Sequence, residues 1–166
     1  MYYMNDKCVL TLNYLLHYLN KIFWVLVIMM ICSGASELAM SQWASAFAES
    51  GLGVSRELGN LLGPFVFAIL MGSARVLYAK FSSRVSLKKL IFLSSVLCIV
   101  SYLTAAFVTV PVISLLACGI CGLSVGILWP GHISNAAGMI PNGGVSMFAL
   151  LALLGDFGCM AGPSIA

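Results

Sequence analysis

Charged residues are scarce in this sequence: Asp, Glu, Lys and Arg make up only 8% of its 166 residues, whereas 61% are hydrophobic. A soluble domain carries roughly 25% charged residues, and so few would leave much of a water-facing surface uncovered. Basic clusters are lacking too, because the longest run of Lys and Arg is Lys88-Lys89. These shortages argue against a soluble domain and against nucleic acid as a partner, and they favour a chain whose solvent is lipid.

Residue arrangements typical of catalysis are also absent. The chain has no HExxH or G-x-S-x-G motif, and His132 has no nucleophile and acid arranged around it. Five of the six cysteines lie inside apolar segments, where cysteine behaves as a small hydrophobic residue. Cys118 and Cys121 have the C-x-x-C spacing, but no second ligand pair, His or charge lies nearby. We therefore expect no enzyme, no cofactor and no metal site.

Long apolar segments are what the chain has instead. A membrane-spanning helix needs about 20 apolar residues, and five such segments follow residues 1–20, a mixed stretch that we interpret as interfacial or cytoplasmic. The predicted spans are 21–47, 60–80, 88–107, 111–139 and 143–166, which together form one transmembrane domain over 21–166. Short connections make consecutive helices antiparallel neighbours. The sequence thus predicts an all-α integral membrane protein with about five transmembrane helices and a lipid bilayer around it.

The two sides of this predicted bundle differ in basic residues. One side holds Lys7, Lys21, Lys80, Arg84, Lys88 and Lys89, whereas the other holds only Arg56, beside Glu49 and Glu57. Because cytoplasmic loops carry the excess of Lys and Arg, the basic side is expected to be cytoplasmic. We predict a multi-pass protein of the plasma membrane with a cytoplasmic N-terminus.

Three ionisable residues fall inside the predicted spans: Glu37, Arg75 and Asp156. An Arg or Asp at the centre of a span costs roughly 2.5–3.5 kcal/mol on insertion scales, so such residues usually face a protein interior or a wet cavity. Glu37 and Asp156 are candidates for binding a substrate or carrying a proton, with hydrogen-bonded packing as the alternative. Arg75 lies close enough to Lys80 for its side chain to reach the interface, which favours a structural or gating role at the cytoplasmic end.

Proline interrupts the fourth predicted span at Pro130, where a kink is expected. Trp129 precedes it near the centre of the span and is a candidate for lining a pocket, whereas His132 and Asn135 lie nearer the end, which favours an interfacial location. Helices interrupted by proline, as at Pro130, expose backbone groups to substrate or ion at transporter binding sites.

Gln42 and Trp43 follow Glu37 on neighbouring faces of the first span.

Glycines recur at positions i, i+3 and i+7 in the last two spans. The first set is Gly119, Gly122 and Gly126, and the second is Gly155, Gly158 and Gly162. This spacing places each set along one stripe of a helix, where small residues let membrane helices approach closely. The stripes predict helix packing.

The order of these features over about residues 21–166 resembles the C-terminal half of a major facilitator superfamily transporter, helices 7 to 11. The first span ends in SELAMSQWASAFAE, and LLGPFVFAILMGSARVLYAKFSSRVSLKK resembles the second copy of the family's signature loop, with Gly72, Arg75, Lys80, Arg84, Lys88 and Lys89 as matching residues. The glycine-rich fourth span and GDFGCMAGPSIA are similar to helices 10 and 11. Ser83 stands where the signature loop usually has an acid.

The resemblance implies a partial major facilitator fold and transport of a small solute by alternating access, often coupled to protons. Glu37, Gln42, Trp43, Trp129 and Asp156 would then face the central cavity, and Arg75 and Arg84 would belong to the cytoplasmic gate. The family has twelve helices in two halves, so we expect a fragment, a split-gene product or a degenerate copy that needs a complementary half. The alternative is an oligomeric channel or assembly protein that associates through its glycine stripes.

Overall fold

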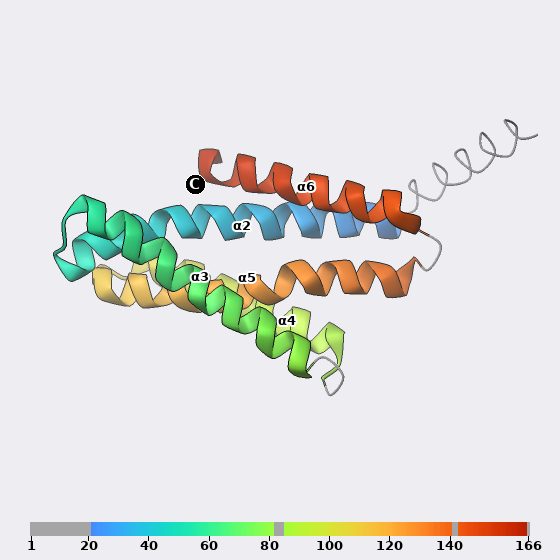
Figure 1. The fold of residues 1–166 in the computed structure, drawn as a ribbon, viewed down its shortest axis with the longest axis horizontal. Helices are drawn as coiled ribbons and strands as arrows, with labels where there is room; N and C mark the ends of the chain where they lie inside the picture. Colours follow the sequence, from blue (N-terminus) through green and yellow to red (C-terminus); the bar gives the residue numbers. More distant parts are fainter. Residues whose placement is uncertain (1–20, 82–84, 141–142, 166) are drawn as a thin grey trace, which may run out of the picture.

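The computed structural model describes residues 21–81, 85–140 and 143–165, and these residues form helices and short connections, without a strand (Figure 1). The helices are α2 (Lys21–Leu52), α3 (Arg56–Phe81), α4 (Leu87–Phe107), α5 (Pro111–Met139) and α6 (Gly144–Ile165). All five are long and apolar enough to cross a membrane. The predicted N-terminal segment 1–20 lies outside the described residues.

The helices differ from the predicted spans mainly at the connection after the first one. α2 continues to Leu52, beyond the predicted end at residue 47, and α3 begins at Arg56 rather than at residue 60. Gly53 terminates α2 with a φ of 64°, a conformation that glycine adopts without steric cost. The polar residues between the first two predicted spans therefore extend two helices, and the loop itself covers only residues 53–55.

Helix α5 remains one helix across Pro130, from Pro111 to Met139. Pro111 occupies the first turn of α5, where backbone N–H groups have no acceptor within the helix, so the N–H that proline lacks is not missed. The chain is therefore not broken into two helices at Pro130, and the residues on both sides of it continue the same helix.

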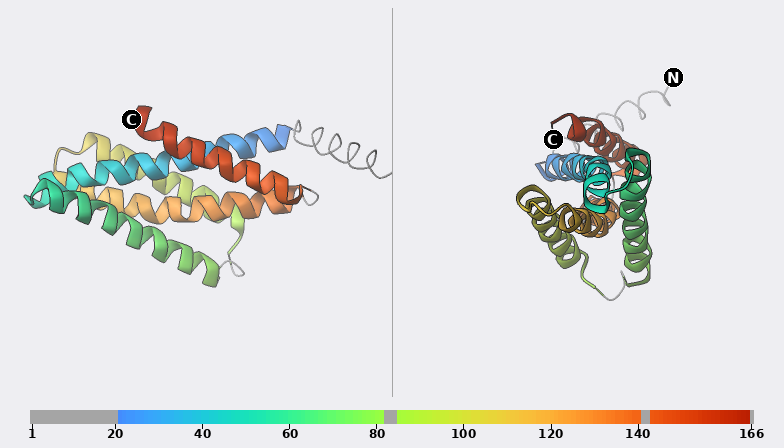
Figure 2. Two further views of the ribbon diagram at one scale, coloured as in Figure 1. Left: turned by 45° about the horizontal axis from the view of Figure 1, so that its top comes forward. Right: turned by 90° about the vertical axis from the view of Figure 1, so that its left-hand side faces the viewer.

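Helix α2 lies at the centre of the arrangement and packs against α3, α5 and α6. α6 runs along one side of α2, and α5 runs along the other (Figure 1). α3 and α4 both pack on α5, and the end-on view in Figure 2 separates their two positions. Consecutive helices run in opposite directions, so residues far apart in the sequence meet near the middle of α2.

The two glycine stripes lie at two different helix contacts. In α6, a Cβ atom added at Gly158 or Gly162 would collide with the backbone of Ile31 or Ala35 in α2. In α5, a Cβ at Gly122 would lie 2.7 Å from the Phe67 carbonyl oxygen of α3. Gly126 lies against Met71 and Gly119 against Leu70 of the same helix. Both stripes are thus occupied by contacts within the chain.

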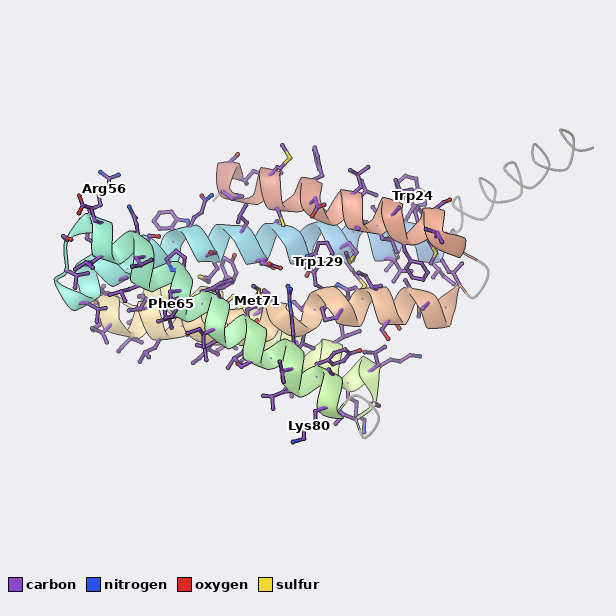
Figure 3. All side chains as sticks on the ribbon, in the orientation of Figure 1. Trp24, Arg56, Phe65, Met71, Lys80 and Trp129 are labelled. Carbon is purple, nitrogen blue, oxygen red and sulfur yellow. The ribbon has the colours of Figure 1, made fainter. Side chains whose placement is uncertain are left out.

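Large apolar side chains cover the outer surface of the bundle, as the sticks in Figure 3 illustrate. Phe107 is 79% exposed, Met160 75% and Phe92 71%. In water, contiguous apolar surface of this extent would mark an interaction site or cause aggregation, whereas in a bilayer it is the expected lipid-facing surface. Figure 3 shows the basic side chains of Lys80 and Arg56 at opposite ends of α3.

Candidate functional site

An ion pair joins α2 to α3 inside the apolar part of the bundle. Nη2 of Arg75 lies 3.8 Å from Oε1 of Glu37, and the two side chains are 47% and 20% exposed. Oε2 of Glu37 is buried and has no hydrogen-bond partner among the described residues. Arg75 also contacts the sulfur of Met71, one turn earlier in α3, at 3.7 Å. The two charges that the sequence placed in separate roles are therefore neighbours.

Asp156 of α6, which is itself exposed, adds a second carboxylate to this region. It lies close enough to Glu37 for the two negative charges to interact, and Cys159, one turn further along α6, lies within electrostatic range of both. α6 reaches this position because Gly155 and Gly158 let its backbone touch α2 beside Gly34 and Ile31. The glycine contact thus sets the spacing between the two carboxylates.

Trp129 closes the region from α5. Its ring lies against Gly155, where a Cβ atom would approach the indole to 2.8 Å, and its Nε1–H has no hydrogen-bond acceptor among the described residues. A hollow of about 330 Å³ is lined by residues of α3 and α5, among them Arg75, Tyr78 and Trp129. Figure 3 shows Trp129 between the ribbons of α2 and α5. Four helices therefore contribute one polar group each: Glu37, Arg75, Trp129 and Asp156.

With all three ionisable groups charged, the cluster has one more negative than positive charge. The indole of Trp129 offers an aromatic face and an N–H donor beside them. Carboxylates and an aromatic face bind cations, and a carboxylate can also take up a proton. The chemistry available here is therefore binding of a proton or of a positively charged solute group, with Arg75 as the competing internal cation.

The other candidate residues lie elsewhere. Gln42 and Trp43 are exposed, and the ring of Trp43 lies 6.2 Å from that of Phe47, tilted by 33°. At about 100° of rotation per residue, these positions are turned well away from the face that carries Glu37. Arg84 lies outside the described residues, so its predicted gating role stays a prediction.

The C-x-x-C cysteines point to different helices. Sγ of Cys121 lies 3.9 Å from Sγ of Cys98 in α4, whereas Sγ of Cys118 lies 3.3 Å from Sδ of Met40 in α2. All three thiols are buried in the larger apolar core cluster. The described residues contain no group of three or more His, Cys, Asp and Glu that could hold a metal ion. The spacing here serves packing between three helices.

Comparison with protein-family models, with curated proteins and with solved structures found no match for this chain. The described residues define a class: they form five helices that are long and apolar enough for a multi-pass membrane protein. Within that class, the distinguishing feature is a cluster of ionisable residues shared by α2, α3 and α6.

Proposed function

We propose that this chain forms part of a secondary transporter of the major facilitator type and that Glu37, Arg75 and Asp156 face its solute pathway. The observation that carries the proposal is the 3.8 Å contact between Glu37 and Arg75 within apolar helices, with Asp156 close by. Ionisable residues at membrane depth are costly and usually mark ion or substrate pathways. The resemblance of residues 21–166 to the C-terminal half of that superfamily gives the same assignment from the order of the sequence motifs.

The pair suggests how binding and movement are coupled. A proton or a cationic solute that binds Glu37 competes with Arg75 for the carboxylate. Loss of that pair weakens a contact between α2 and α3, so the occupied and the empty site favour different helix arrangements. Asp156 supplies the negative charge that draws the proton or solute into the site. This scheme is one half of an alternating-access cycle.

The proposal carries further expectations. A transporter of this type has a second wall to its cavity, supplied by a complementary half in the same polypeptide or in a partner. Lys21, Lys80, Lys88 and Lys89 lie at one end of the helices and Glu49, Arg56 and Glu57 near the other. The positive-inside rule then places the lysine-rich end in the cytoplasm of a cell with this protein in its plasma membrane.

The alternative, an oligomeric channel or assembly protein, rested on glycine stripes that are free to bind a second copy. Both stripes are occupied within the chain, by α3 and by α2. The described residues thus offer no glycine stripe for self-association, and no specific observation favours this alternative.

Uptake by the protein purified from its source membranes, with any chains that copurify, tests the proposal. Proteoliposomes with an imposed proton gradient are offered radiolabelled neutral sugars, amino acids and organic amines in turn, and proton entry is followed with a trapped pH dye. We expect one of these classes to accumulate, and Asp156→Asn and Glu37→Gln to lower its uptake by an order of magnitude or more. Glu57→Gln, at the exposed start of α3, is the matched control and keeps normal uptake. Accumulation unaffected by both Asp156→Asn and Glu37→Gln overturns the proposal.

A further inference from the structure

A second hollow has none of the three ionisable residues of the cluster in its lining. It measures about 400 Å³ and is bounded by α2, α4 and α5. Pockets for small molecules typically span roughly 300–1,000 Å³. Its lining residues are Met29, Cys32, Ser33, Ser36, Ser95, Cys98, Ile99, Tyr102, Leu103, Leu128 and His132. None of them carries a carboxylate or a permanent positive charge.

Most polar side chains in this lining have partners within the protein. Ser36 and Ser95 donate to backbone carbonyls of their own helices at 2.9 Å each, and the Tyr102 hydroxyl donates to the Ser36 carbonyl at 2.8 Å. The Cys98 thiol lies 3.9 Å from that of Cys121. Hydrogen bonding inside the chain therefore accounts for all of these groups.

Ser33 and His132 are the exceptions. Ser33 is 2% exposed and His132 4% exposed. The Ser33 hydroxyl oxygen and both His132 ring nitrogens have no hydrogen-bond partner among the described residues. A neutral imidazole presents one donor and one acceptor, and a hydroxyl presents both. Buried polar groups are nearly always paired, so these two unpaired side chains in the wall of the hollow are the groups that a polar molecule inside it would pair with once they turn toward it.

The rim of the hollow defines how that molecule enters. Cys32 on α2 and Ile99 and Leu103 on α4 are exposed on the outer surface of the bundle, which in a bilayer faces hydrocarbon. The absence of charge in the lining disfavours an ion, and the apolar rim favours entry from the lipid phase.

We propose that the hollow between α2, α4 and α5 binds a neutral, mainly apolar molecule from the bilayer that carries one hydroxyl group, and that the buried His132 and Ser33 side chains turn toward the hollow to hydrogen-bond to it. The apolar body of this molecule lies along Met29, Ile99 and Leu103. This site does not depend on transport, and its lining contains none of Glu37, Arg75 and Asp156.

Photolabelling tests this site in membranes that contain the complete protein with its native partners. The probe is an octanol that carries a diazirine, and an octane with the same diazirine is its matched apolar control. We expect the alcohol to label peptides of α2, α4 and α5 that line the hollow, several-fold more than the alkane does, and excess unlabelled octanol to suppress the reaction.

Adjacent residues of α4 supply the control variants. Ile99→Trp fills the hollow and should lower alcohol labelling several-fold, whereas Val100→Trp places the same ring on lipid-facing surface that is not part of the lining and should leave labelling unchanged. His132→Phe should remove the preference for alcohol over alkane, and His132→Gln, which keeps a donor and an acceptor, should retain part of it.

Labelling that is spread over all lipid-facing helices, equal for alcohol and alkane, or insensitive to Ile99→Trp overturns the proposal. So does disulfide cross-linking of Leu103→Cys to a helix of another chain in the same membranes, because that helix would occupy the hollow instead. Val100→Trp also reports on folding, since a loss of labelling there means that the helices themselves have moved.

Discussion

The contact between α6 and α2 gives the sharpest prediction about stability. In Gly158→Ala, the added methyl group collides with the backbone of Ile31 in the facing helix. No change of side-chain rotamer relieves this collision, so the two helices must move apart. Gly72 in α3 is the matched control, because a Cβ atom there has nothing within 4 Å.

Overpacking a well-packed interface costs about 1–3 kcal/mol, which is about a 5-fold to 140-fold shift in the unfolding equilibrium at 1.4 kcal/mol per tenfold. Gly72→Ala replaces glycine by the best helix former and gains up to about 1 kcal/mol. The two substitutions are chemically identical, so the difference between them isolates the helix contact.

The assay is reversible unfolding of the purified protein in mixed detergent micelles, with the fraction of SDS as the denaturant and helix content as the signal. We expect Gly158→Ala to shift the midpoint to a lower SDS fraction and Gly72→Ala to leave it unchanged or raise it. Equal midpoints for both variants would refute the α2–α6 contact described above, and with it the placement of Asp156 near Glu37.

Two further predictions concern contacts across helices. Glu37→Gln and Arg75→Met each remove one partner of the Glu37–Arg75 pair, so the sum of their two destabilisations should exceed that of the double variant. In a double-mutant cycle by SDS unfolding, we expect a coupling energy of about 0.5–3 kcal/mol. Additive effects would show that the pair does not form. Mild oxidation with iodine should join Cys98 to Cys121, whose sulfurs lie 3.9 Å apart, as a disulfide visible by mass spectrometry after proteolysis; a pairing of Cys121 with any other cysteine would contradict the α4–α5 packing.

Much of the fold follows from local properties of the sequence. Five apolar segments separated by short polar connections predict five helices, because each satisfies its own backbone hydrogen bonds in lipid. The helix boundaries are harder to predict: the first predicted span ends at residue 47, whereas α2 continues to Leu52 and stops at the positive φ of Gly53. Helix length there depends on where one glycine can turn the chain.

The candidate site was only partly accessible to the same reasoning. Glu37, Arg75 and Asp156 stand out as ionisable residues in apolar segments, so the sequence identifies them singly. Their proximity depends on how α3 and α6 cross α2, which no local pattern specifies. The resemblance implies that Gln42 and Trp43 share a cavity with Glu37, but a rotation of about 100° per residue turns both positions well away from the face that carries Glu37.

His132 shows a different difficulty. Its distance from the end of the fourth span favoured an interfacial location, yet the side chain is only 4% exposed. Burial of His132 results from α4 packing on α5 with Ile91 against Gly131, a contact between segments about forty residues apart. The sequence around His132 therefore does not predict its burial, which depends on which helices pack together.

The central claim is that the ionisable cluster lines a water-filled pathway while the opposite face of α2 meets lipid. The native Cys159 lies near Glu37 and Asp156, and Cys32 lies on the rim of the apolar hollow. Each is kept in turn as the single cysteine and exposed in membranes to charged methanethiosulfonate reagents. We predict that Cys159 reacts, faster with the cationic than with the anionic reagent, and that Cys32 does not. Reaction of Cys32 with both reagents, or of neither cysteine, would contradict this account.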